Sequence, residues 1–242
     1  MSHASEERPL PFSRALGGLT AREPLSRSSF RRLLAAILIL GLAVRLVLIV
    51  LKGGSYHFAD TAEYDAAARA MLGGHVRPDT PRAALYPAFM ALVYRLAGPG
   101  NFPAVRLAQL AFGLGVIWLT AWLGRRIGTP RVGLLAALGV ALAPTLVYTS
   151  TMLYPSALYT ALILSCTLLA HELGRTPRFL PAIGFGAFAG LAWLTDPVAA
   201  APIGALLLWI LAGARRHAAR LRLVVPAMLL ALLAVVGSTA LL

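Results

Sequence analysis

The sequence predicts an all-α protein that crosses a membrane several times. Hydrophobic residues make up 59% of the 242 residues, charged residues only 13%, and the mean hydropathy is +0.76. An ordinary soluble domain is about half apolar and about a quarter charged. The apolar residues also fall in runs of membrane-spanning length, which excludes an ordinary soluble enzyme and indicates a polytopic membrane protein.

The chain begins with a polar, basic segment that is followed by the first expected membrane helix. Residues 1–32 contain six arginines and are expected to form a disordered tail on the cytoplasmic side. The apolar run 33–51 is too long for a signal-peptide core and has no small-residue cleavage site after it, so it is expected to remain in the protein. Residues 33–242 are then expected to form one transmembrane domain.

Six further apolar segments follow a polar loop at residues 52–104, which gives about seven spans. The fifth and sixth spans are the shortest compared with the roughly 20 residues that a membrane helix needs. Prolines stand at or near the segment ends, where lost backbone hydrogen bonds are easiest to replace. The six segments are 105–124, 132–149, 155–170, 180–194, 197–213 and 223–242.

The distribution of basic residues predicts the orientation. The sequence pI is about 11.3, which often indicates nucleic-acid binding, but 15 of the 22 Lys and Arg fall in four segments on one side of the expected spans. The opposite turns, 150–155 and 195–197, contain none. Cytoplasmic loops carry such an excess. The pattern therefore predicts a plasma-membrane (inner-membrane) protein with a cytoplasmic N-terminus and a periplasmic or extracellular first loop, and with the bilayer rather than nucleic acid as its partner.

Three of the nine acidic residues are gathered in the first loop, in the segment FADTAEYDAAARAMLGG at residues 58–74. Its spacing predicts a short amphipathic helix on the outer membrane surface, ended by two glycines. A second such helix is expected over 83–96. The first helix should carry Tyr64, Ala67 and Met71 on the same face as Asp60, and an Asp65–Arg69 ion pair on the opposite face.

Four short motifs follow one another along the chain. They are D-x-x-x-Y, R-x-x-L-Y-P, V-R-L-x-Q and G-L-A-x-L-T-x-P, which start at Asp60, Arg82, Val105 and Gly190. In this order the motifs resemble the GT-C glycosyltransferases. The branch with the greatest resemblance includes the dolichyl-phosphate-mannose protein mannosyltransferases and the lipid A aminoarabinose transferase.

The resemblance implies transfer of a sugar from a polyprenyl-phosphate donor to an extracytoplasmic lipid, glycan or protein acceptor, with inversion. It implies that Asp60 is the catalytic base, since an attacking hydroxyl must lose a proton. Cationic side chains would stabilise the leaving phosphate, and further residues would contact the substrates. The expected phosphate-binding residues are Arg82, Arg106 and Arg45, and the expected substrate-binding residues are Glu63, Tyr64 and Tyr86.

The sequence departs from the family pattern at three places. Thr61 follows Asp60 where relatives often have a second acid, and Asp196 stands where a basic residue is common. The chain ends at Leu242, whereas such enzymes usually have more spans and a soluble C-terminal region. These departures lead to the expectation of an N-terminal half that is inactive alone.

Each site residue also has a structural interpretation that the sequence leaves open. Asp60 and Glu63 have the form of a capping box, and Tyr64 and Tyr86 fit interfacial anchors. Arg45 is within snorkelling reach of the outer boundary, and the other two arginines fit lipid headgroup contacts. We expect no cofactor other than the polyprenyl-phosphate sugar, which is the donor substrate. The sequence contains no cluster of metal ligands, and metal dependence stays open.

Two other classes of function remain as alternatives. A non-catalytic lipid-binding or assembly protein would keep the same scaffold without turnover. A small-solute transporter would need polar or ionisable residues near the bilayer midplane and broken helices that face one another. The later expected spans contain almost no such residues, so the sequence favours transport least.

Overall fold

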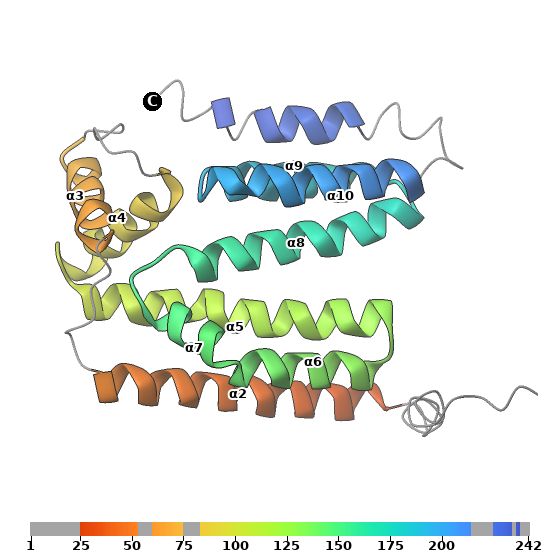
Figure 1. Cartoon of the computed structure of the whole chain (residues 1–242), viewed down its shortest axis with the longest axis horizontal. Coiled ribbons are helices and arrows are strands. Elements are labelled where there is room, and N and C mark those ends of the chain that lie inside the picture. The colour runs from red at the N-terminus through yellow and green to blue at the C-terminus, as the bar shows by residue number, and fades with distance from the viewer. Residues whose placement is uncertain (1–24, 53–59, 75–82, 214–224, 234–235, 238–242) are drawn as a thin grey trace, which may run out of the picture.

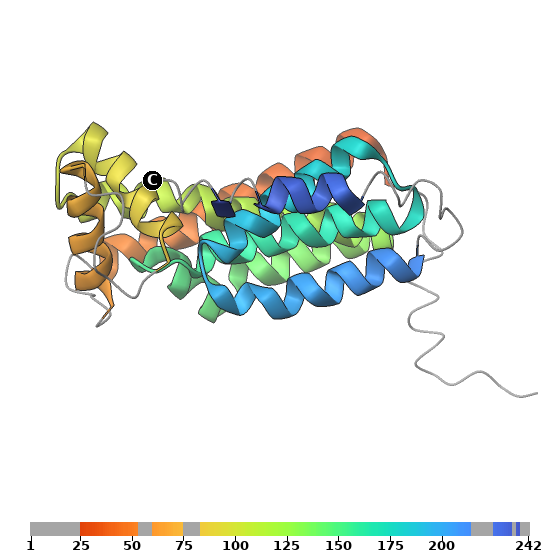
Figure 2. The same ribbon diagram turned by 90° about the horizontal axis from the view of Figure 1, so that it is seen from above.

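In the computed structural model, every element of the described part of the chain is a helix. The structure describes residues 25–52, 60–74, 83–213, 225–233 and 236–237. The long helices lie side by side in a bundle, and two short helices gather at one end of it (Figures 1 and 2). The prediction of an all-α membrane protein is confirmed.

Within the described residues, three helices are long and apolar enough to cross a membrane. They are α2 (Arg27–Lys52), α5 (Phe102–Ile127) and α8 (Ser156–Arg175). Helix α2 begins before the expected start at residue 33, so the last residues of the expected tail are helical, while residues 1–24 lie outside the described part.

The expected segment 132–149 is divided in the structure, which corrects the prediction of one continuous helix. It consists of α6 (Pro130–Leu142) and α7 (Pro144–Thr151), bent by 58° at the break. Pro144 has no backbone N–H and cannot continue the hydrogen-bond ladder of α6. The pair counts as a fourth crossing only if both parts form one broken span.

The later expected segments contain shorter apolar helices: α9 (Phe179–Trp193), η1 (Pro197–Ala199), α10 (Ala200–Gly213) and a helix at 225–233. Their positions agree with the fifth to seventh expected spans. Their lengths do not establish a crossing, so the count of seven spans stays a prediction.

Helix α2 exposes large apolar side chains near its C-terminal end. Val50 and Leu51 are each 78% exposed, and Ile39 in the middle of the helix is 68% exposed. Contiguous exposed apolar surface is unfavourable in water and marks a membrane or protein contact. This face of α2 therefore fits lipid contact.

Helices α5 and α6 pack with their backbones in direct contact at a pair of glycines. A Cβ atom on Gly124 would lie 2.8 Å from the Cα of Gly133, and a Cβ on Gly133 would overlap the carbonyl oxygen of Ala121. Small residues permit such close approach between membrane helices. The interface therefore depends on the absence of a side chain at residue 133.

We expect Gly133→Ala to lower the free energy of unfolding by about 1–3 kcal/mol, because overpacking forces the two backbones apart. Gly139→Ala is the matched control in the same helix, since its Cβ would meet nothing within 4 Å. Thermal unfolding of both variants in detergent measures the difference. Equal melting temperatures for the two variants would contradict the close approach of α5 and α6.

The two short helices of the first loop are α3 (Thr61–Leu72) and α4 (Leu85–Ala97), which confirms both expected helices. Helix α3 is followed by Gly73 and Gly74, and α4 is followed by Gly98. Gly74 and Gly98 have positive φ angles of +89° and +95°. The backbone N–H of Leu85 donates to the carbonyl of Leu194 at 2.9 Å. This bond ties the start of α4 to the end of α9.

Candidate functional site

The candidate site is built from elements that meet at the α3 and α4 end of the bundle (Figure 1). The ring of Tyr64 in α3 packs edge to face on that of Tyr86 in α4, with 5.1 Å between the ring centroids. It also packs against the ring of Tyr154, which lies between α7 and α8, with 6.3 Å between the centroids. The structure therefore brings the first-loop helices onto the turn that precedes α8.

Asp60 lies at the N-terminal end of α3 and is half-buried. Its backbone carbonyl accepts a hydrogen bond from Tyr64 N at 3.1 Å, but its side chain makes no capping hydrogen bond. Its φ and ψ of −72° and −16° are helical, whereas a capping residue normally has an extended backbone. The interpretation of the Asp60 side chain as the cap of α3 is therefore wrong.

The apolar face predicted for this helix is confirmed. Tyr64 is 6% exposed and Ala67 is fully buried, and Met71 packs against the same core. Glu63, in the first turn of α3, is half-buried. Its expected contact with substrate stays a prediction.

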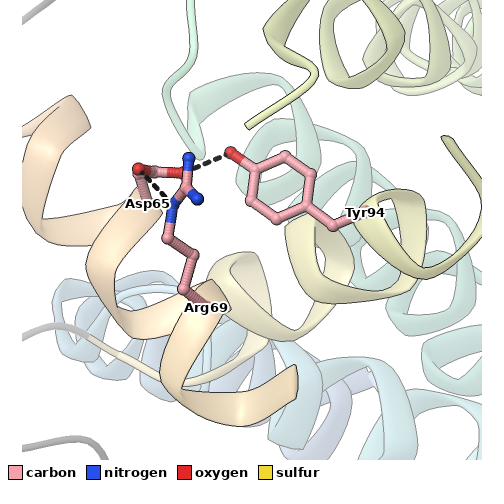
Figure 3. A network of polar contacts seen from close by, with 3 residues as sticks. All are labelled: Asp65, Arg69 and Tyr94. Carbon is pink, nitrogen blue, oxygen red and sulfur yellow. Dashed lines mark hydrogen bonds and ion pairs between the residues drawn. The ribbon is translucent and has the colours of Figure 1, made fainter. Parts of the chain in front are cut away.

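The expected ion pair between Asp65 and Arg69 is present, and it has a third member that the sequence did not indicate (Figure 3). Asp65 Oδ2 accepts from Arg69 Nε at 2.9 Å, and Asp65 Oδ1 accepts from the Tyr94 hydroxyl at 2.6 Å. Burial and the bond to Asp65 raise the pKa of Tyr94, so this tyrosine stays a donor at physiological pH. The network ties α3 to α4.

Tyr94→Phe should loosen α3 from α4 without unfolding the bundle. Loss of one hydrogen bond to a charged group costs about 1.5 kcal/mol, which is about tenfold in a local opening equilibrium. Amide hydrogen exchange within residues 61–72 should rise by this factor, while exchange in α5 stays the same. Tyr159→Phe is the control, since the Tyr159 hydroxyl makes no hydrogen bond within the described residues; similar exchange in both variants would refute the link.

Tyr86 is fully buried, and its hydroxyl donates to Gln109 Oε1 at 2.7 Å. A fully buried side chain does not lie at the membrane interface, so the anchor interpretation of Tyr86 is wrong, while its expected contact with substrate stays a prediction. Tyr64, at 6% exposure, is also mainly a core residue in this arrangement. The two rings fix how α3 sits on α4.

Gln109 is the residue that joins this cluster to the long helices. Its side-chain amide donates to the carbonyls of Met152 at 2.6 Å and Ser150 at 3.2 Å, and it is fully buried. One side chain therefore connects α4, α5 and the end of α7. In the sequence, Gln109 is marked only as the last position of the V-R-L-x-Q motif. A side-chain amide inside an apolar segment is itself a sign of a buried polar contact.

Arg106, in the second turn of α5, is 4% exposed and lies within electrostatic range of Tyr86. Its position places a buried cation near Tyr86. Arg82 lies outside the described residues. The donor-phosphate roles of both arginines stay predictions.

Arg45 points into the bundle rather than toward the outer boundary, so the snorkelling interpretation is wrong. It is 1% exposed, and its guanidinium donates to Ser150 Oγ at 2.9 Å and to the carbonyls of Gly41 at 3.0 Å and Ala141 at 3.2 Å. Ala141 is the second-last residue of α6, close to the break between α6 and α7. These contacts give Arg45 a part in holding the bend, and a phosphate-binding role is not tested by them.

Asp196 is a further acid at this end, in the turn between α9 and η1. Its Oδ1 accepts from Val198 N at 2.9 Å, so Asp196 caps η1. Among the described residues, no group of three or more His, Cys, Asp or Glu side chains is arranged to hold a metal ion. The arrangement therefore offers carboxylates and buried cations.

Comparison with known proteins gives one family. The family model described as dolichyl-phosphate-mannose-protein mannosyltransferase matches residues 80–239, which is more than half of the chain. No curated protein and no solved structure matches. The matched region contains Tyr86, Arg106 and Gln109, whereas Asp60 precedes it.

Proposed function

Because the chain belongs to the dolichyl-phosphate-mannose-protein mannosyltransferase family, and so is a membrane glycosyltransferase of the GT-C type, we propose that it moves a sugar from a polyprenyl-phosphate donor to an extracytoplasmic acceptor. The acceptor is a hydroxyl of a lipid, a glycan or a protein. The proposal includes the predicted orientation, in which the α3 and α4 end faces the periplasm or the exterior.

The proposed reaction is a single displacement with inversion. The acceptor oxygen forms a bond to the anomeric carbon while the bond from that carbon to the donor phosphate oxygen breaks. Asp60 accepts the proton of the attacking hydroxyl. The leaving lipid phosphate takes the electron pair of the broken bond, and Arg82 and Arg106 stabilise its charge.

One observation supports this assignment of roles most directly. The α3 helix that begins after Asp60 and the α5 helix that carries Arg106 are held at the same end of the bundle by two contacts: Tyr64 in α3 packs on Tyr86 in α4, and the Tyr86 hydroxyl donates to Gln109 in α5. Asp60, the proposed base, and Arg106, a proposed phosphate-binding cation, are therefore carried by helices that are packed together at one end of the bundle. The Asp60 side chain does not cap α3.

The experiment that tests the proposal has two readouts on membranes in which these residues are part of a complete, transfer-competent enzyme, since the 242-residue chain is expected to be inactive alone. A photoactivatable polyprenyl phosphate should crosslink to the α3, α4 and α5 region, and a radiolabelled polyprenyl-phosphate sugar should lose its sugar to an acceptor. Crosslinking without transfer would favour the alternative of a non-catalytic lipid-binding protein. Absence of crosslinking in the presence of solute-dependent transport would favour a transporter and overturn the proposal.

A further inference from the structure

A cavity lies at the opposite end of the bundle from α3 and α4 and has no part in the proposed reaction. It has a volume of about 490 Å³ and lies between the first turns of α2 and the last turns of α5. Three arginines and two tryptophans supply most of its lining: Arg27, Arg31, Arg125, Trp118 and Trp122. We call it the arginine cavity.

The charge around the arginine cavity is of one sign. The lining contains no acidic residue, and α2 has no acidic residue in its first turn. Arg27 and Arg31 stand at the N-terminal end of α2, where the helix dipole already favours an anion. Glu172, a carboxylate at this end of the bundle, is engaged by Arg126 at 3.2 Å. The cavity therefore concentrates positive potential that an anionic group would neutralise.

Arg125 is held in place by aromatic rings before any ligand arrives. Its Cζ lies 5.0 Å from the ring centre of Phe30 and 5.2 Å from that of Trp122. Phe30 is 3% exposed, so the ring beneath the guanidinium is fixed in the core. A stacked arginine keeps its planar donors for a phosphate or carboxylate and loses less rotamer freedom on binding.

The surface around the cavity suits a lipid ligand better than a free anion. Trp118 is 44% exposed, and the neighbouring surface of α2 exposes Leu33 (47%), Ile39 (68%) and Leu40 (41%). Tryptophan concentrates at membrane interfaces, and exposed apolar residues continue from the cavity along the helix toward the bundle centre. A ligand with an anionic head and apolar tails matches both surfaces.

We propose that the arginine cavity binds the phosphate of an anionic phospholipid headgroup. Phosphatidylglycerol has this chemistry. In the orientation that the sequence predicts, the cavity faces the cytoplasmic leaflet, which carries anionic lipids, and basic clusters next to membrane helices bind such headgroups. The site is independent of the sugar-transfer proposal, since it lies at the other end of α5.

The test uses the purified full chain in a neutral detergent, titrated with phosphatidylglycerol or phosphatidylcholine. Native mass spectrometry counts retained lipid, and thermal unfolding reports stabilisation. Phosphatidylglycerol should bind and raise the melting temperature more than phosphatidylcholine. Arg27→Gln/Arg31→Gln should weaken its apparent affinity about 30-fold, since each arginine that lines the cavity is expected to contribute about 1 kcal/mol to binding of the headgroup.

Arg175→Gln/Arg178→Gln is the matched control. It removes the same charge from exposed residues of the same end of the bundle that do not line the cavity, and it should leave lipid binding almost unchanged. Equal weakening by both double variants would mean that the attraction is only general charge and would overturn the site. Equal stabilisation by inorganic phosphate, or by phosphatidylcholine, would overturn the assignment to an anionic lipid.

Discussion

Asp60→Asn is expected to reduce sugar transfer by about 10²- to 10⁴-fold, the usual contribution of a general base. Asparagine has almost the same shape as aspartate but cannot accept a proton from the acceptor hydroxyl. Because the Asp60 side chain makes no capping hydrogen bond in α3, the substitution removes none of the bonds that start this helix. The comparison is made in membranes where the wild-type chain supports transfer.

The control separates chemistry from folding. Glu63→Gln neutralises another half-buried acid in the first turn of the same helix, and it should have a much smaller effect on the turnover rate. Donor crosslinking should persist in Asp60→Asn, which would show that the variant still folds and binds the donor. Transfer at the wild-type rate by Asp60→Asn would show that this carboxylate is not the base.

Gln109→Leu is expected to have the largest effect on stability. Leucine has a similar volume but leaves the Tyr86 hydroxyl and the carbonyls of Ser150 and Met152 without their buried partner. Each buried polar group that loses its partner costs about 1–3 kcal/mol, while an average hydrogen bond between membrane helices contributes about 0.6 kcal/mol. A loss of about 2–4 kcal/mol in the free energy of unfolding follows.

A double-mutant cycle with Tyr86→Phe tests the mechanism of this loss. Removal of the Tyr86 hydroxyl should destabilise the wild type but should be nearly neutral or stabilising in the Gln109→Leu background, where the hydroxyl has already lost its acceptor. Thr120→Val serves as a control in α5, because Thr120 Oγ1 bonds only the carbonyl of Val116 one turn earlier. Additive effects of Gln109→Leu and Tyr86→Phe would contradict the buried bond.

The elements of the fold were predictable because each depends on local sequence. Runs of apolar residues fix where the long helices lie, and the periodicity of the first loop fixes α3 and α4. The break at Ala143–Pro144 was harder to predict, because a proline near a segment end and a proline that divides a segment have the same local pattern. A proline alone therefore does not show whether a helix ends at it or is divided by it.

The site was less predictable because its contacts join distant parts of the chain. The depth of Arg45 in its span followed from the sequence, but its direction depends on Ser150, which is 105 residues away. The Asp60-x-x-Glu63 pattern predicted a cap, whereas the backbone at Asp60 is already helical. Tyr86 fits a surface anchor by composition, and only its partner Gln109 shows that it belongs in the core.

The attachment of α3 has a mechanical consequence. The helix is fastened to α4 by Asp65 and Tyr94, and α4 is fastened in turn by Leu85 to the end of α9. The backbone at Asp60 is thus attached to the bundle through α3 and α4. In the proposed reaction, therefore, the acceptor rather than Asp60 makes most of the adjustment in geometry. We expect acceptors with a conformationally flexible hydroxyl to react faster than rigid ones.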